Sequence, residues 1–290
     1  MDKSTKLYFH AFNVLLLIIL FASYSHSSSR IPYGFISSTV SISGPSGTGS
    51  GLFVRTNKSA YLITARHVIF NDKMTLLNNT VELISYSNDP NDLLPYRIEL
   101  DLVKLNKNNH VHFHKSHDIA MIRIQQRPNN DNTGKFAWID GIKIHSTPNT
   151  KNDIGIEMND LRLYKDVSIG NDTLIFGYPN SIGLKELPQI DFSRPLLRKG
   201  VIAGKNNTMK TIIIDCPVYG GNSGGPVMEI EEEWITITNY NIIGIVTQFI
   251  PVKETWLNID LKYANINLSN SGYAVVEPAD YLIELIKQYD

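Results

Sequence analysis

The sequence predicts an all-β protein with one helix near its C-terminal end. Short stretches of alternating apolar and polar residues, such as residues 81–86 and 96–103, recur between turns rich in Gly, Pro and Asn. Short strands separated by such turns are typical of a β-barrel. Helical spacing of apolar residues occurs only at residues 278–286, where Pro278 supplies a common helix start.

The composition is that of an ordinary globular protein. The chain has 290 residues, of which 42% are hydrophobic and 19% charged, enough for a full core. Its formal net charge of -1 argues against a dedicated nucleic-acid or anionic-membrane binder, since such proteins usually carry a basic excess. We therefore expect polypeptide partners, and nothing in the sequence calls for a cofactor.

Residues 1–27 have the features of an export signal. Lys3 and Lys6 precede an apolar run at residues 14–22, and small polar residues follow. The run is too short for a comfortable membrane span, so we expect cleavage and a secreted or periplasmic protein of residues 28–290. An uncleaved N-terminal anchor is the alternative, because no clear A-x-A cleavage site is present, and it would be the only membrane contact.

Cys216 is the only cysteine, so no intrachain disulfide can form. It follows the apolar run at residues 212–214. We expect a buried, inert thiol without a redox or catalytic role.

The stretch at residues 219–227 carries one serine, Ser223, among four glycines. Glycines at this density let backbone N–H groups approach a developing oxyanion. The stretch also fits the G-x-S-x-G elbow of α/β-hydrolases, whose base follows the nucleophile in the chain. The last histidine is His145, so the base must lie upstream. His67 follows a short apolar strand and Asp118 begins an alternating one, which gives the order His, Asp, Ser.

The contexts of these three residues resemble the trypsin/chymotrypsin-like serine proteases. His67 lies in a T-A-x-H motif, Asp118 in D-I-A and Ser223 in G-N-S-G-G-P. The similarity is greatest to the disulfide-free bacterial branch with HtrA-like and glutamyl-endopeptidase-like enzymes, and it extends over roughly residues 35–280. It implies two antiparallel six-stranded Greek-key barrels with the active site between them. These would span about residues 35–125 and 165–275, joined by an irregular connection and followed by a helix at residues 278–288.

The resemblance also implies a serine endopeptidase that forms an acyl-enzyme. Ser223 would be the nucleophile, His67 its base, and Asp118 the group that holds the base in the right tautomer. The N–H groups of Gly221 and Ser223 would form the oxyanion hole. Thr247 matches the serine that touches the triad aspartate in this family. The alternative is a peptide-binding module that keeps the fold without proteolysis.

The same resemblance predicts a neutral specificity pocket. Pro217 stands where trypsin-like enzymes have an aspartate, and Val218 beside it is apolar. Val246 stands where glutamyl endopeptidases have a histidine. Phe249 aligns with a glycine at the pocket entrance of wide-mouthed relatives. Together with Thr247, these substrate-binding residues favour small uncharged side chains, such as Ala or Val, at the cleaved position.

Two further segments allow competing interpretations. The glycine-rich residues 46–51 suggest phosphate binding, but no G-K-[ST] follows, so we expect a tight β-turn. His110, His112 and His114 alternate as metal ligands on a strand would. They lie among Asn and Lys residues without an obvious carboxylate ligand, so we expect a solvated loop and no metal.

Asn222 bears on how the nucleophile loop is held. In chymotrypsin-type zymogens, the residue before the nucleophile is an aspartate that pairs with a newly formed amino terminus. The neutral Asn222 cannot make that ion pair. We therefore expect hydrogen bonds to hold the loop, with no requirement for a particular N-terminus.

Overall fold

The structure is a computed structural model that describes residues 31–87, 89, 91–128, 135–149, 154–180, 187–233, 237–258 and 262–290. The predicted export signal lies outside these residues. Residues 32–231 and 239–290 form one compact unit, and residues 1–31 and 232–238 are assigned to another. The unit of residues 32–231 and 239–290 contains both β bodies and the final helix. Within the described ranges, no helix is long and apolar enough to cross a membrane.

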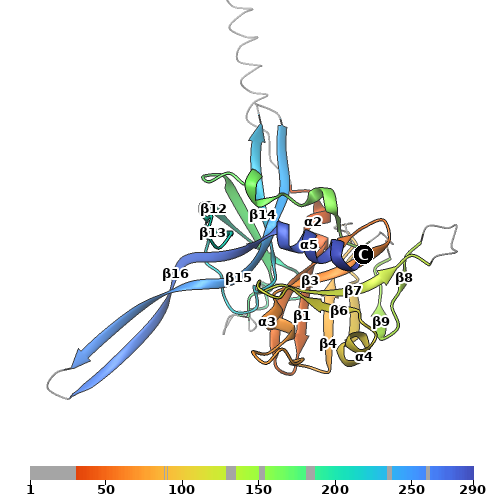
Figure 1. Cartoon of the computed structure of the whole chain (residues 1–290), viewed down its shortest axis with the longest axis horizontal. Helices are drawn as coiled ribbons and strands as arrows, with labels where there is room; N and C mark the ends of the chain where they lie inside the picture. The colour runs from red at the N-terminus through yellow and green to blue at the C-terminus, as the bar shows by residue number, and fades with distance from the viewer. Residues whose placement is uncertain are drawn as a thin grey trace, which may run out of the picture. The chain divides into compact units, whose positions relative to one another are not determined.

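The first half of the unit is a ten-stranded, mainly antiparallel sheet (Figure 1). A short helix, α2 (Tyr33–Ser37), precedes it, and α4 (Leu102–Lys107) follows the fifth strand. Eight strands form a continuous path, and β8 and β10 pair with β7 and β2. In order along the path they are β6 (Val111–Phe113), β7 (Ala120–Gln126), β3 (Ser59–Thr64), β2 (Gly47–Arg55), β1 (Thr39–Gly44), β4 (Thr80–Ser85), β5 (Tyr96–Asp101) and β9 (Ile142–Ser146).

The apolar patterns explain which strands are central. Every residue of β3 is buried, which fits its central place in the sheet and its continuous apolar run. In β4 exposed and buried residues alternate instead, because one face of this strand meets water. Phe53, Leu62, Ile98 and Ile122 belong to the core beneath the sheet.

The described parts of residues 125–168 are more ordered than expected. They contain β8 (Ala137–Trp138), β9 and β10 (Ile156–Glu157), each of which pairs with a strand of the first sheet. Trp138, Ile142 and Ile144 are partly buried against the first core. The expectation of an irregular connection is wrong here, because these short apolar stretches gain order only by pairing with strands distant in sequence.

The second half is a closed barrel of six strands, as expected. Its core includes Ile175, Ile202, Val227 and Val276. The predicted all-β class with two β bodies and a C-terminal helix is confirmed. The barrel strands in order are β11 (Asp172–Gly177), β12 (Leu196–Asn206), β13 (Thr211–Asp215), β16 (Tyr263–Pro278), β15 (Ile237–Asn258) and β14 (Pro226–Glu233).

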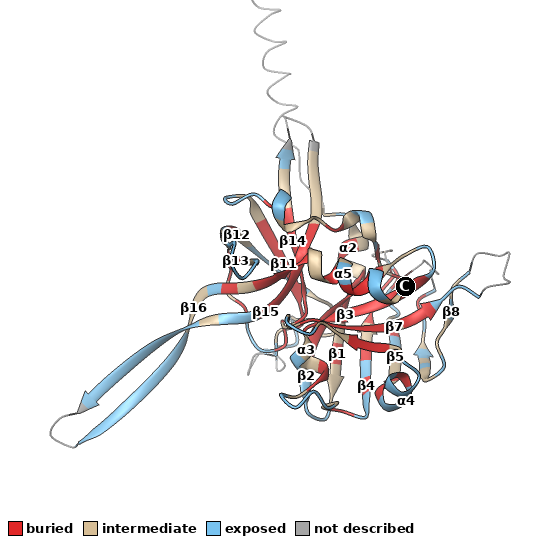
Figure 2. Ribbon diagram, in the orientation of Figure 1, coloured by how far each residue is buried: buried red, intermediate tan, exposed pale blue. Residues whose placement is uncertain are grey.

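The outer parts of β15 and β16 form a long two-stranded hairpin that runs out from the barrel (Figures 1 and 2). Residues 251–258 pair with residues 263–270 in an uninterrupted antiparallel register. The pairing of β15 with β16 therefore continues to Asn258. Six large apolar side chains of the hairpin are exposed: Val252, Trp256, Leu257, Tyr263, Ile266 and Leu268.

The final helix, α5 (Ala279–Tyr289), matches the predicted segment closely and packs on the first half of the unit. Its apolar face buries Leu282, Leu285 and Ile286. The side chain of Asp290 after the helix accepts a hydrogen bond from the Tyr61 hydroxyl at 2.9 Å. The helix thus connects the end of the second barrel to β3 of the first sheet.

The alternating histidines do not lie in a solvated loop, so that expectation is wrong. His112 is in β6, is buried, and stacks on Tyr289 with ring centroids 3.6 Å apart. His114 packs beside His117 and Tyr281. Within the described part of the chain no group of three or more His, Cys, Asp or Glu side chains is arranged to hold a metal ion. These histidines instead form much of the surface on which α5 docks.

This docking surface should make the protein less stable in mild acid. Burial, followed by the charge of Arg123, lowers the pKa of His112. Burial, followed by the charge of His117, also lowers the pKa of His114, and these effects outweigh the opposite effect of Glu277 and Glu284. Each ring has a lower pKa in the folded state than in the unfolded state, so folding favours the neutral ring. Its contribution to the free energy of unfolding is therefore present above the unfolded pKa of 6.5 and is lost as the pH falls through the lower folded pKa.

Urea unfolding at about pH 7.5 and about pH 5 will measure this loss. His112→Phe keeps an aromatic ring against Tyr289 but cannot take up a proton, so it should reduce the loss. An unchanged loss in His112→Phe would contradict the role given to His112.

Candidate active site

His67 and Asp118 meet where β3 gives way to a short helix. β3 ends at Thr64, and α3 (Arg66–Ile69) begins after the single intervening residue Ala65. His67 therefore lies in the first turn of α3. His67 Nδ1 lies 2.6 Å from Asp118 Oδ2, and the His67 N–H donates to Asp118 Oδ1 at 3.0 Å. The Arg66 N–H donates to the Asp118 carbonyl oxygen at 3.2 Å. Asp118 is therefore bound to α3 through both its side chain and its backbone.

The environment keeps the Asp118 carboxylate ionised. Burial alone would raise the pKa of Asp118, but the hydrogen bond and charge of His67, with the nearby Arg66, outweigh it and lower the pKa below its ordinary value. An ionised carboxylate can only accept, so the His67 Nδ1–H is the donor. The other ring nitrogen of a neutral His67 is then free to take a proton.

The loop that carries Ser223 has the conformation for which its glycines are needed. Gly221 and Gly224 have φ values of +93° and +84°, in the left-handed region. A Cβ on Gly224 would lie 2.3 Å from the Ser50 carbonyl oxygen, and one on Gly221 would lie 2.3 Å from the Tyr178 carbonyl oxygen. Both positions therefore require glycine for space as well as for backbone conformation.

The N–H groups of Gly221 and Ser223, like those of Tyr219 and Gly220, have no acceptor among the described residues. The Gly220 carbonyl oxygen accepts from the Asn180 N–H at 2.6 Å. Because the peptide bond between Gly220 and Gly221 is trans, the Gly221 N–H points the opposite way from that carbonyl. Its orientation leaves this N–H available to an incoming oxygen atom.

Ser50 of β2 holds the loop from the first sheet. Its hydroxyl donates to the Gly221 carbonyl oxygen at 2.7 Å and accepts from the Tyr178 N–H at 2.9 Å. Its N–H donates to the Ser223 carbonyl oxygen at 2.8 Å. A Cβ on Gly49 would lie 3.3 Å from that same oxygen, so a glycine beside Ser50 permits this close approach.

Sequence reasoning missed Ser50. The tight β-turn expected in this stretch is present at residues 45 and 46, and Gly49 and Ser50 follow within β2. The alternation of glycines with hydroxyl residues was the available signal. Asn222, next to Ser223, is buried, and its Oδ1 has no partner in the described part of the chain.

A hollow of about 220 Å³ lies beside Ser223. His67 and Ser223 both line it, together with the predicted pocket residues Val218, Thr247 and Phe249. The predicted Pro217 is not among the lining residues. Among the described contacts, Thr247 makes no hydrogen bond to Asp118, and Glu277 Oε1 accepts from the Asp118 N–H instead, at 3.4 Å. Glu277 is the second residue that sequence reasoning missed.

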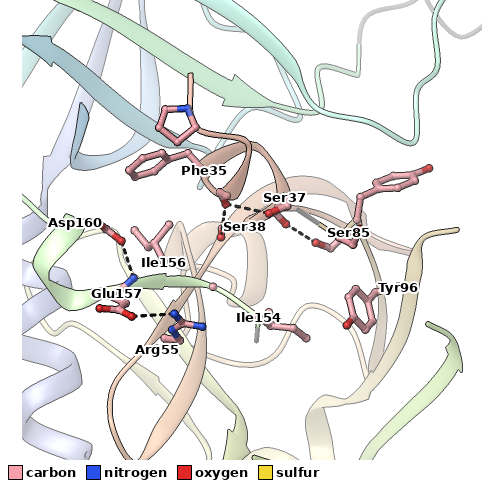
Figure 3. Close-up of a pocket in the computed structure, with 15 residues that line it drawn as sticks. Phe35, Ser37, Ser38, Arg55, Ser85, Tyr96, Ile154, Ile156, Glu157 and Asp160 are labelled. Atoms are coloured by element: carbon pink, nitrogen blue, oxygen red, sulfur yellow. Dashed lines mark hydrogen bonds and ion pairs between the residues drawn. The ribbon is translucent and has the colours of Figure 1, made fainter. Parts of the chain in front are cut away.

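A second hollow, of about 260 Å³, lies against the first sheet beside α2 and β10 (Figure 3). Its charged residues are engaged within the protein: Arg55 Nη2 lies 2.9 Å from Glu157 Oε1, and Asp160 accepts from the Glu157 N–H. Among its described lining residues there is no histidine, and its two carboxylates, Glu157 and Asp160, are already bound by Arg55 and by a backbone N–H. The hollow beside Ser223, which a histidine lines, is therefore the candidate active site.

Cys216 is buried, and burial raises its pKa to about 11. A thiol in this state is almost entirely protonated at neutral pH and is a poor nucleophile. The predicted burial of the Cys216 thiol is confirmed.

The family model described as "Trypsin-like peptidase domain" matches residues 49–237. The chain belongs to the trypsin-like peptidase family. The resemblance stated from its motifs is therefore confirmed. No curated protein matches this trypsin-like peptidase significantly in sequence.

Three solved structures are similar to this trypsin-like peptidase at low sequence identity. The HtrA-type protease AlgW with a tripeptide is 14% identical with a TM-score of 0.49 over 91% of this chain, which spans 62% of the AlgW chain. An inactive form of Rv3671c from M. tuberculosis H37Rv is 12% identical, with a TM-score of 0.46 and 92% of each chain covered. The protease Anisep from Arthrobacter nicotinovorans is 13% identical, with a TM-score of 0.44 and coverage of 84% and 90%.

Proposed function

We propose that this trypsin-like peptidase is a serine endopeptidase whose triad is His67, Asp118 and Ser223. The observation that carries the proposal is the 2.6 Å contact between His67 Nδ1 and Asp118 Oδ2 at the edge of the hollow that Ser223 also lines. A histidine oriented by a carboxylate, next to a serine in a glycine-rich loop, has the roles needed for nucleophilic acyl transfer.

In the first half of the reaction, the Ser223 hydroxyl attacks the carbonyl carbon of the scissile bond while His67 takes its proton. The resulting imidazolium is stabilised by Asp118, which remains ionised. His67 then gives the proton to the leaving amine, and an acyl-enzyme on Ser223 remains. Water attacks this ester by the same route, which releases the acid product and restores the serine.

The free N–H groups of Gly221 and Ser223 are the proposed oxyanion hole. Negative charge develops on the substrate oxygen during attack, and two fixed N–H donors stabilise it without reorganisation. The bond from Ser50 to the Gly221 carbonyl oxygen and the bond from Asn180 to the Gly220 carbonyl oxygen keep these donors oriented.

A fluorophosphonate probe tests the triad, because it reacts with a serine only when a base activates the hydroxyl. We expect labelling of the parent at Ser223, located by mass spectrometry, and loss of labelling in Ser223→Ala and His67→Ala. A folded parent protein that is not labelled would contradict the triad and would favour a binding module on the same fold.

The hollow should prefer small uncharged side chains at the cleaved position. Val218, Val246 and Phe249 line it, and no Asp, Glu, Lys or Arg is found among its described lining residues. A charged side chain there would lose its water without a partner, at a cost of several kcal/mol, whereas an apolar one gains about 1.5 to 3 kcal/mol on burial. We therefore expect a higher kcat/KM for peptides with Val at the cleaved position than for matched peptides with Phe, Arg or Glu.

The outcomes of this comparison separate two ideas. Faster cleavage after Arg or Glu would contradict the neutral pocket. Faster cleavage after Phe would contradict only the size limit given to Phe249, and Phe249→Gly should then leave the preference unchanged.

We also propose that residues 28–290 form the mature protease and that it acts on polypeptides outside the cytoplasm. The charged and apolar pattern of residues 1–27 supports export. Sequencing the N-terminus of the protein recovered from the exported fraction tests this directly.

A further inference from the structure

Asp118 is held from two sides, and the second side involves residues outside the triad. On one side lies α3, with the bonds from Arg66 and His67. On the other side lies Glu277, near the end of β16, whose Oε1 accepts from the Asp118 N–H at 3.4 Å. Glu277 Oε2 lies 2.9 Å from Nδ1 of His117, the residue before Asp118. One carboxylate therefore contacts two consecutive residues.

This contact is shielded from water. The side chains of Glu277 and His117 are 10% and 16% exposed. The His117 ring also stacks on Tyr281 of α5, with centroids 3.4 Å apart and planes inclined by 20°. His114 Nδ1 accepts from the His117 N–H at 3.1 Å. His117, the residue before Asp118, is thus held by the side chains of Glu277, Tyr281 and His114.

Glu277 also belongs to the strand pair that supports the nucleophile. Its neighbour Val276 is opposite Val246 of β15 in the barrel register. The Val246 carbonyl oxygen accepts from the Gly224 N–H at 2.7 Å, and the Val246 N–H donates to the Gly225 carbonyl oxygen at 2.9 Å. A short path of backbone hydrogen bonds therefore leads from the residue that holds Asp118 to the residues that follow Ser223.

We propose that Glu277 is a positioning residue, which fixes Asp118 through its N–H and through His117 relative to the barrel strands that hold the Ser223 loop. This inference rests on the proposed triad. Glu277 touches no reacting atom, so it acts only through Asp118 and the orientation that Asp118 gives to His67. A small displacement of the base from its productive geometry is costly in rate even when substrate binding is intact.

The test compares four variants in a peptide hydrolysis assay that separates kcat from KM. Glu277→Ala removes both contacts and should lower kcat by about 10- to 100-fold with little change in KM. Glu277→Gln keeps an oxygen for the Asp118 N–H and an amide for His117, so it should restore most of the parent kcat. Glu277→Asp keeps the charge but is too short to reach both partners, so it should be slow.

Glu284→Ala is the matched control. Glu284 lies on α5, its side chain is 65% exposed, and its closest ion-pair distance is 3.8 Å, to His114. It does not contact Asp118, so its kcat should equal that of the parent. If Glu277→Ala does not fold, the comparison of Glu277→Asp with Glu277→Gln carries the test.

A parent-like kcat in folded Glu277→Ala, or in Glu277→Asp, would overturn the inference. A Glu277→Gln variant as slow as Glu277→Ala would also overturn it, because the positions of the hydrogen-bonding atoms are retained there. Ser223→Ala in the same assay distinguishes this failure from failure of the triad: it must be inactive if the triad is right, whatever Glu277 does.

Discussion

Replacing Ser223 by alanine should lower kcat by about 10⁴- to 10⁶-fold, and adding His67→Ala to that variant should cause almost no further loss. The hydroxyl and its base act as a unit, because a base without a nucleophile has no proton to remove. The contact of His67 with Asp118 places the imidazole for this single task. Steady-state kinetics on one peptide for both single variants and the double variant measure the effect.

Ser43→Ala is a suitable control, since the Ser43 hydroxyl makes only a 3.4 Å bond to the Glu82 carbonyl oxygen at the surface. It should hydrolyse the peptide at the parent rate. Losses that add in the double variant would show that Ser223 and His67 contribute independently, which is incompatible with a triad.

Gly221→Ala should lower kcat/KM by about 10²- to 10³-fold, as expected for loss of one oxyanion donor. The added Cβ would lie 2.3 Å from the Tyr178 carbonyl oxygen, and the backbone at φ +93° disfavours any side chain. The residue must move, and its N–H moves with it. Kinetics and urea unfolding of the same preparation separate lost activity from lost stability.

Gly170→Ala provides the comparison, because Gly170 also has a positive φ, +97°, but a Cβ there would meet nothing within 4 Å. It should lose a modest amount of stability through backbone strain and keep its kcat/KM. Equal activity of Gly221→Ala and Gly170→Ala would exclude Gly221 from the oxyanion hole.

The sequence was sufficient for features encoded in short local patterns. The strand before His67, the strand after Asp118 and the glycines around Ser223 each reveal a local conformation, and the order of the three residues excludes the hydrolase elbow. The helix α5 could likewise be predicted from the helical spacing of apolar residues at 278–286.

Features that depend on distant partners could not be predicted in this way. Ser50 bonds to a residue 171 positions away, and Glu277 is 160 positions from His117. The glycine and hydroxyl alternation around Ser50 does not reveal its distant partner, and Glu277 has no local pattern that distinguishes it from an ordinary strand residue. His112 and His114 were expected to be solvated because the helix that packs against them, α5, lies more than 160 residues later in the sequence.

These long connections impose an order on the assembly of the proposed site during synthesis. His67 and Asp118 are made early and can fold with the first sheet. Gly221 and Ser223 come later, and their loop is oriented only after it meets Ser50 of the first sheet and Val246 of β15. Asp118 obtains its last partner when residue 277 has been added. A growing chain therefore contains His67, Asp118 and Ser223 before the contacts of Val246 and Glu277 that orient them can form.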